Sequence, residues 1–226
     1  MPPHDLVFLI DVDNTLLDND AVIEDLRRHL RGAFGADRER QYWDIFENLR
    51  RELGYADYLG ALQRYRVENP HDPQLLRISL FLLHYPFAGR LYPHALAVIA
   101  DLRRQGPVVI LSDGDVVFQP LKVERSGLWA AVEGHVLIYV HKEQMLDDVA
   151  GRYPAAKYVM VDDKLWILEA IKRVWQDRVT TVFVRQGHYA HDPAMTSGHQ
   201  PADVSIDRIG DLIAALDGKP GLATRP

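Results

Sequence analysis

The sequence contains no cysteine, which excludes disulfide bonds, thiolate metal ligands and a cysteine nucleophile. It also lacks an apolar run long enough to span a membrane. The first residues, Met1 to Asp5, have neither the basic region nor the apolar stretch of a signal peptide. We therefore expect a soluble cytoplasmic protein that does not associate with membranes.

Positive charge is not in excess either. The chain carries 26 Lys and Arg against 32 Asp and Glu, a net charge of -6. Because nucleic-acid binding usually needs a basic surface, we expect no nucleic-acid partner. An anionic small substrate is not excluded, since local charges and a bound metal can attract it. With 226 residues, the chain can form one large domain or a core with an insertion.

The first third of the chain changes from a strand to a helical block. The apolar run from Leu6 to Ile10 predicts a buried strand. Apolar residues at helical spacing then predict four helices, the first capped by Asp20 and the fourth beginning at Asp72 and Pro73. The predicted ranges are 21–34, 38–53, 58–67 and 72–84.

Strands and helices alternate in the second half, which favours a parallel sheet covered by helices on both faces. The predicted strands are 108–111, 136–140, 158–161 and 179–184, and the predicted helices are 93–105, 116–126, 143–152 and 165–175. We expect a long loop at 187–203, a last short helix capped by Asp207, and a frayed tail at 217–226.

Polar residues follow four of the five predicted strands. They are Asp11 with Asp13, Ser112 with Asp113, His141 with Lys142, and Asp162 with Asp163. Because ligands of open parallel sheets bind beyond the carboxyl ends of the strands, these residues predict a site at that edge. Two carboxylates two residues apart, such as Asp11 and Asp13, can project to one side of the chain.

The run Asp11-x-Asp13-x-Thr15, followed by Leu-Leu-Asp, resembles the first motif of the haloacid dehalogenase (HAD) superfamily. The other three polar sets resemble the remaining motifs, in order, and the likeness extends from Leu6 to about Val184. The resemblance implies an α/β fold with a three-layer Rossmann-type core, formed by residues 1–18 and 91–226. It also implies an all-helical cap domain of the C1 type at residues 19–90, inserted after the first strand.

The resemblance further implies a role for each motif residue. Asp11 would attack phosphorus and form an aspartyl-phosphate, and Asp13 would act as acid and base. A Mg²⁺ cofactor would be held by Asp11, the backbone carbonyl of Asp13, and Asp163 with Asp162 close by. The phosphate would be held by Thr15, Ser112, the backbone N–H of Asp113, and Lys142.

The expected function is therefore Mg²⁺-dependent hydrolysis of a small phosphorylated metabolite. Two alternatives stay open: a phosphosugar mutase, which shares all four motifs, and a catalytically silent domain that binds a phosphorylated ligand. Asp13 argues against the dehalogenases of the family, which attack carbon and need no Mg²⁺. Because the first lysine is Lys122, outside the expected cap, Schiff-base phosphonatase chemistry is not expected either. The sequence leaves monomer and dimer open.

Three positions depart from the family pattern. Asp113 stands where asparagine is common, Glu143 follows Lys142 where proline is expected, and Trp166 occupies a position that is often acidic. We expect the charge of Asp113 to be paired or to point away from the phosphate. We also expect metal binding to depend on Asp162 and Asp163 alone at the fourth motif.

Other polar and aromatic residues have weaker signals. His188, His191 and His199 lack a carboxylate or cysteine complement, so we expect them at the surface or at the edge of a substrate site rather than around zinc. We interpret Trp43, Trp166 and Trp175 as packing residues on apolar helix faces. The cap residues that could meet a substrate are Arg51, Arg64, Arg66 and His84, although solvation is the more common state of such residues.

Overall fold

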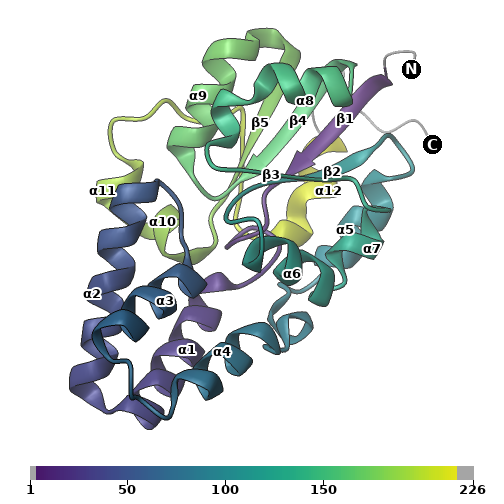
Figure 1. Cartoon of the computed structure of the whole chain (residues 1–226). Coiled ribbons are helices and arrows are strands. Elements are labelled where there is room, and N and C mark those ends of the chain that lie inside the picture. The colour runs from purple at the N-terminus through teal and green to yellow at the C-terminus, as the bar shows by residue number, and fades with distance from the viewer. Residues whose placement is uncertain (1–3, 218–226) are drawn as a thin grey trace.

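A parallel sheet of six strands forms the centre of the computed structural model, which describes residues 4–217 (Figure 1). The strand order is β3-β2-β1-β4-β5-β6, so β1 lies in the middle between β2 and β4. The strands are β1 (His4–Ile10), β2 (Val108–Asp113), β3 (Val136–Tyr139), β4 (Ala155–Asp162), β5 (Val179–Val184) and β6 (Val204–Ile206). The predicted α/β class with a parallel sheet is confirmed.

Helices cover both faces of this sheet, because alternate residues of each apolar strand point to opposite sides. Phe8 and Ile10 of β1 pack in one apolar cluster, whereas Val7 and Leu9 pack in another. The first cluster includes residues of α5 (Ala95–Leu102), α6 (Phe118–Arg125), α7 (Leu128–Ala131) and α12 (Leu212–Asp217). The second includes residues of α8 (Leu146–Arg152) and α9 (Leu165–Trp175).

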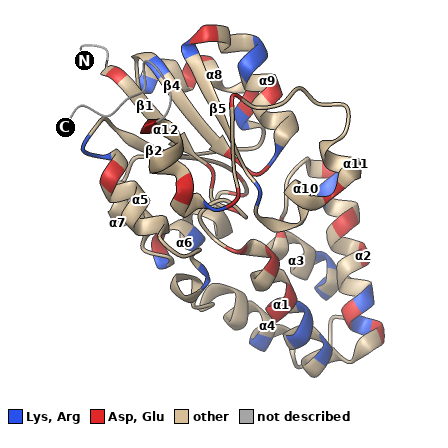
Figure 2. Cartoon of the chain, turned by 180° about the vertical axis from the view of Figure 1, so that it is seen from behind, with Lys and Arg blue, Asp and Glu red and all other residues tan. Residues whose placement is uncertain are grey.

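Four helices between β1 and β2 pack together beyond the carboxyl ends of the strands (Figure 1). They are α1 (Asn19–Phe34), α2 (Ala36–Leu53), α3 (Tyr58–Glu68) and α4 (Leu75–Leu83). Tyr42, Tyr65 and Ile78 are among the fully buried side chains between them. Acidic and basic residues are interspersed along α1 and α2 (Figure 2). The assignment of these helices to a C1-type cap domain remains a prediction.

Two connections join the helical segment to the sheet, and they run side by side. The N–H of Asp18 donates to the carbonyl of Arg90 at 2.8 Å, and the N–H of Tyr92 donates to that of Leu16 at 2.9 Å. Short 3₁₀ turns complete the chain: η1 (Phe87–Arg90), η2 (Lys142–Gln144), η3 (Gln176–Arg178) and η4 (Ile209–Asp211).

Some element boundaries differ from the sequence prediction. Asp18 rather than Asp20 caps α1, since its Oδ1 accepts from the N–H of Ala21 at 2.9 Å. The fourth helix begins at Leu75, because Asp72 forms a turn by accepting from the N–H of Gln74.

The predicted loop at 187–203 is wrong in part. It contains α10 (Gly187–His191) and α11 (Pro193–Thr196), and the short strand β6 follows it. From residue 218 on, the predicted tail lies outside the described residues. Between residues 4 and 217, no helix combines the length and the apolar character needed to cross a membrane.

Candidate active site

Lys142 joins two of the strand-end carboxylates. Its fully buried Nζ lies 2.6 Å from Oδ1 of Asp11 and 2.6 Å from Oδ2 of Asp162. Burial alone would lower the pKa of Lys142, but Asp11 and Asp162 raise this pKa well above its usual value. Burial would likewise raise the pKa of Asp11, but Lys142 and Lys164 lower it. Asp11 is therefore held as a carboxylate although it is buried.

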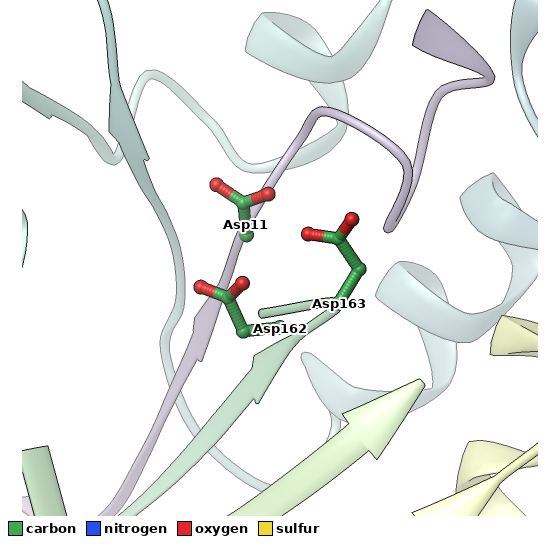
Figure 3. Close-up of side chains that lie close together, drawn as sticks. All are labelled: Asp11, Asp162 and Asp163. Carbon is green, nitrogen blue, oxygen red and sulfur yellow. The ribbon is translucent and has the colours of Figure 1, made fainter. Parts of the chain in front are cut away.

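Three aspartates form a buried acidic cluster. Asp11, Asp162 and Asp163 each present an oxygen within 4.8 Å of the others (Figure 3). Both oxygens of Asp163, and Oδ2 of Asp11, are buried without a hydrogen-bond partner. Burial, together with the charges of Asp162 and Asp11, raises the pKa of Asp163 well above its usual value despite the nearby Lys164.

This cluster fits a divalent cation. A buried carboxylate without a donor costs about 1–3 kcal/mol or more, and hard cations such as Mg²⁺ bind carboxylate oxygens. In the part of the chain that the structure describes, no other group of three or more His, Cys, Asp or Glu residues is arranged closely enough to hold a metal ion. Asp162 is already engaged by Lys142 and by the N–H of Lys164 at 2.9 Å, so Asp163 and Asp11 have the free oxygens.

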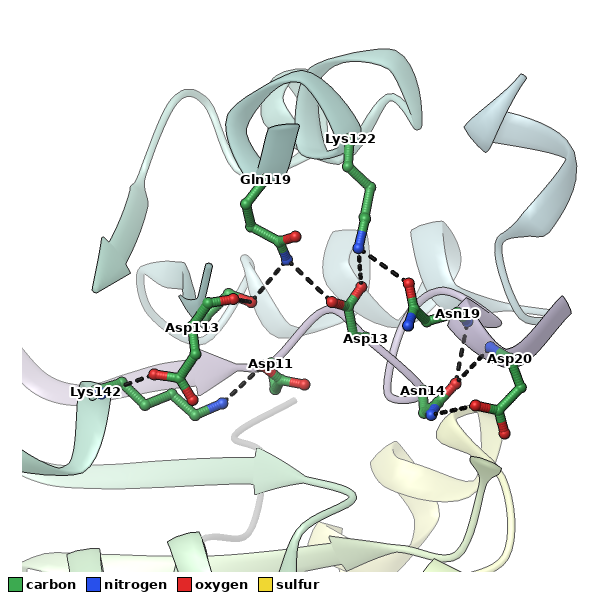
Figure 4. A network of polar contacts seen from close by, with 10 residues as sticks. Asp11, Asp13, Asn14, Asn19, Asp20, Asp113, Gln119, Lys122 and Lys142 are labelled. Carbon is green, nitrogen blue, oxygen red and sulfur yellow. Dashed lines mark hydrogen bonds and ion pairs between the residues drawn. The ribbon is translucent and has the colours of Figure 1, made fainter. Parts of the chain in front are cut away.

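Asp13 points to a different set of partners. Its Oδ1 accepts from Nζ of Lys122 at 2.7 Å, and its Oδ2 accepts from Nε2 of Gln119 at 3.4 Å (Figure 4). The Lys122 ammonium also donates to Oδ1 of Asn19 at 3.0 Å, at the first residue of α1. Lys122 is 1% exposed, and the Asp13 side chain keeps 24% of its surface accessible. Asp13 is thus anchored, yet open toward the space above the sheet.

Lys122 and Gln119 are site residues that sequence reasoning missed. They lie three positions apart on α6, directly after the second motif, and both are buried. Residues at this spacing lie on one face of a helix. The sequence signal that could have identified them is a lysine and a glutamine on the face of α6 that is directed to the core, where such residues are rare. Lys164 was missed as well. Burial lowers its pKa, but Asp11 and Asp163 more than offset this effect, so the amine is held as a cation.

The predicted phosphate-binding residues lie around the same strand ends. The Ser112 hydroxyl is buried and accepts from Nε2 of Gln119 at 3.0 Å. Oδ1 of Asp113 accepts from the backbone N–H of Lys142 at 2.8 Å. That its charge is paired or points away from the phosphate stays a prediction. Burial is the main cause that raises the pKa of Asp113, and the two lysines oppose it. Thr15 is fully buried and its hydroxyl has no partner, so its role stays a prediction.

The charges of the site would balance with one divalent cation bound. Five carboxylates, from Asp11, Asp13, Asp113, Asp162 and Asp163, face three ammonium groups, from Lys122, Lys142 and Lys164. With all of them ionised, the difference of two negative charges equals the charge of one divalent cation. This balance is a second reason why the site suits Mg²⁺.

A cleft of about 860 Å³ opens between the strand ends and the helices α1 and α2. Asp13, Asp113 and Lys164 lie along its sheet side, and Trp43, Phe46 and Arg50 line its helical side. The interpretation of Trp43, Trp166 and Trp175 as packing residues is therefore incomplete. Trp175 does pack, with its ring 4.2 Å from that of Tyr158, but Trp43 and Trp166 line the cleft.

The histidines separate in space. His188 lines the cleft, and its Nδ1 lies 2.6 Å from Oδ1 of Asp20. His199 contacts Glu169 at 2.7 Å instead. Of the cap residues named from the sequence, Arg51 contacts Asn48 and Arg64 pairs with Glu52, both away from the cleft. The arginines that do line it, Arg27 and Arg50, were not predicted.

Comparisons with known proteins identify the family of this chain and structures of the same fold. The family model of haloacid dehalogenase-like hydrolases matches residues 6–174. A crystal structure of a haloacid dehalogenase-like hydrolase from Burkholderia xenovorans is 65% identical, with a TM-score of 0.89, over 93% of this chain and 95% of that one. A search of curated proteins found no significant match.

More distant structures share the fold. The HAD hydrolase YfnB from Bacillus subtilis, solved bound to magnesium, has a TM-score of 0.62 at 18% identity over 93% of this chain and 98% of that one. The L-2-haloacid dehalogenase of Xanthobacter autotrophicus, with chloropropionic acid covalently bound, has a TM-score of 0.61 at 18% identity over 95% of this chain and 99% of that one.

Proposed function

The chain belongs to the haloacid dehalogenase-like hydrolases, and within this family we propose that it is a Mg²⁺-dependent phosphohydrolase that cleaves a phosphomonoester through an aspartyl-phosphate on Asp11. The observation that carries the proposal is the separation of two neighbouring carboxylates. Asp11 is paired with Lys142 and has a free Oδ2, whereas Asp13 is turned to Lys122 at the edge of the cleft. One carboxylate is thus available for attack and the other for proton transfer.

In the first step, a carboxylate oxygen of Asp11 forms a bond to phosphorus while the bond to the leaving alkoxide breaks. For this step Asp13 must first take up a proton, and it gives that proton to the alkoxide, which leaves as an alcohol. In the second step, Asp13 takes a proton from a water molecule, the water oxygen bonds to phosphorus, and the bond to Asp11 breaks. The products are the alcohol and inorganic phosphate, with Asp11 restored as a carboxylate and Asp13 as a carboxylic acid.

The surrounding residues supply charge and position. Lys142 neutralises Asp11 from the buried side, so that an anionic phosphate can approach. Ser112, whose hydroxyl accepts from Gln119, would donate to a phosphate oxygen. Mg²⁺ would be held by Asp11 and Asp163 with Asp162 beside them, and when bound it offsets the repulsion between carboxylate and phosphate.

Dehalogenation is the competing activity in this family. A dehalogenase attacks carbon with its first aspartate and needs no metal, so it would leave the free oxygens of Asp163 without a use. It would also have no task for Asp13, which two buried side chains hold in position. These contacts favour phosphoryl transfer. The mutase alternative uses the same residues and differs in whether water reaches the intermediate.

The test is phosphate release from a panel of phosphomonoesters, with Mg²⁺ or with chelator. We expect release by the wild type with Mg²⁺ only, and a loss of at least about 10³-fold in Asp11→Asn, because the amide cannot act as nucleophile. Asp147→Asn, an exposed substitution on α8, is the matched control and should keep full activity.

Halide release from 2-haloacids is measured alongside. Halide release without phosphate release would overturn the proposal. So would Mg²⁺-independent turnover, or turnover that survives in Asp11→Asn. Interconversion of phosphosugar isomers without net phosphate release would establish the mutase instead.

A further inference from the structure

The cleft is much larger than the phosphate group that the proposed reaction handles. Its volume of about 860 Å³ is near the upper end for pockets that enclose whole drug-sized ligands. The phosphate would occupy only the end next to Asp13 and Asp113, which both line the cleft. Most of the space therefore remains for the leaving group, and a small aliphatic phosphate would leave the far wall uncontacted.

Aromatic side chains form two walls of this space. On the helical side, the rings of Trp43 and Phe46 meet edge to face with centroids 5.2 Å apart. On the sheet side, Trp166 meets Tyr189 in the same way at 5.5 Å. The Lys164 ammonium lies 5.5 Å from the Tyr189 ring, so this second wall begins next to the phosphate site. Trp43 and Phe46 are only 8% and 4% exposed and offer little ring surface, whereas Trp166 and Tyr189 are partly exposed. The wall formed by Trp166 and Tyr189 therefore offers the aromatic surface against which a flat ring can pack.

The charges in the walls do not suit a second phosphate. Arg27 lies 4.6 Å from the Trp43 ring and 3.6 Å from Glu39, and Arg50 lies 3.7 Å from Glu47. Each arginine that lines the cleft therefore has a carboxylate neighbour, and Figure 2 shows acidic and basic residues interspersed along α1 and α2. Such walls offer both donors and acceptors without an excess of positive charge, which suits neutral hydrogen-bonding groups.

We infer that the substrate is a phosphomonoester whose alcohol carries a planar aromatic ring with hydrogen-bonding groups, as in a nucleoside monophosphate. The inference rests on the proposed phosphohydrolase function and specifies its substrate class. Trp166 and Tyr189 are the specificity residues, because both line the cleft, their rings contact each other, and Tyr189 lies next to Lys164.

Nucleoside 5′-monophosphates and ribose 5-phosphate provide the test, since they share the same phosphate ester and differ only in the base. Stacking of a base on aromatic side chains predicts a kcat/KM about 5- to 150-fold higher for the nucleotide. The gain should reside mainly in KM, because the ring binds equally in the ground and transition states.

Trp166→Leu and Tyr189→Leu should each bring the ratio of kcat/KM between the two substrates toward one. Trp129→Leu is the matched control, since Trp129 is 42% exposed on α7 and does not line the cleft, and it should leave the ratio unchanged. Circular dichroism and thermal unfolding of each variant establish that it is folded.

The two levels of the proposal fail in different ways. If the wild type uses ribose 5-phosphate as well as the nucleotides, or if the ratio survives in both cleft variants, the substrate class is wrong but the phosphohydrolase stands. If no phosphomonoester of the panel is hydrolysed with Mg²⁺, the proposed function itself is wrong.

Discussion

Lys122 is a buried cation whose partners are Asp13 and Asn19. A lysine ammonium enclosed in this way is costly to bury unless its partners repay the lost hydration. Its contact with Asp13 fixes the direction of the carboxylate that the proposed mechanism uses to transfer protons. Lys122 is therefore a positioning residue, acting through Asp13.

We expect Lys122→Met to lower kcat/KM for alkyl phosphates about 10- to 100-fold. This loss corresponds to the free energy of one hydrogen bond to a charged group. Aryl phosphates should lose much less, because a good leaving group needs little protonation. Steady-state kinetics over a series of leaving groups measures the difference. A uniform loss across the series would assign Lys122 a purely structural role.

Some residues of the site could be predicted from the sequence, and others could not. Asp11, Lys142 and Asp163 follow predicted strands, and parallel pairing necessarily brings such ends to one edge. Lys122 and Gln119 come from inside a helix, where a lone lysine is usually solvated. Their contacts with Asp13 depend on the packing of α6 against the loop that follows β1, which is a tertiary contact that no local pattern reveals.

At the scale of elements, the best predictions concern strongly patterned segments. Helix α9 and strand β5 begin and end where the sequence predicts, because helical apolar spacing and β-branched residues define them locally. Helices α10 and α11 are only five and four residues long, and β6 has three. Elements this short depend on tertiary contacts, such as the pairing of Ser205 with Phe183, which no local pattern reveals.

One of these short elements supports the catalytic loop. Gly187 begins α10 with φ of 70°, and a Cβ there would lie 2.4 Å from the Asn14 side chain. Asn14 in turn accepts from the N–H groups of Asn19 and Asp20, and Asp20 accepts from the N–H of His188. Helix α10, the loop after β1 and helix α1 are therefore connected at this point.

We expect Gly187→Ala to lower the free energy of unfolding by about 2–4 kcal/mol, because it adds a steric clash to the cost of the left-handed backbone. Gly198→Ala is the matched control. It has φ of 84° with nothing within 4 Å of the added Cβ, so only the backbone cost of about 1 kcal/mol should remain. Urea unfolding measures both, and equal losses would contradict the importance of the Asn14 contact.

At the scale of the whole molecule, the cleft lies between the strand ends of the sheet and the helical segment α1 to α4. The chain passes from one to the other twice. The paired connections at Asp18 and Arg90 are adjacent, which suits a hinge, whereas contacts on the other side of the cleft join α2 to α10 through Arg50 and Tyr189. The sequence predicted the positions of the connections from where the helical block begins and ends. It did not predict the contact with α10, because that segment resembled a loop.

The acidic cluster connects the site with the stability of the whole fold. Asp163 is buried with two unpartnered oxygens beside Asp11 and Asp162, so without a cation it destabilises the folded state. Mg²⁺ that binds only the folded chain should raise the Tm, and above the Kd this rise should follow the logarithm of the Mg²⁺ concentration. Asp163→Asn removes one buried charge and its repulsion.

We therefore expect Asp163→Asn to raise the Tm of the metal-free protein by about 2–8 °C, for a gain of roughly 1–2 kcal/mol, and to abolish most of the Mg²⁺-dependent rise. Differential scanning calorimetry with chelator and with a Mg²⁺ series measures both effects, and Asp147→Asn should behave as the wild type. A metal-free variant less stable than the wild type, or one with an undiminished response to Mg²⁺, would contradict the assignment. The first would mean that Asp163 already has a stabilising partner, and the second that the cation binds elsewhere.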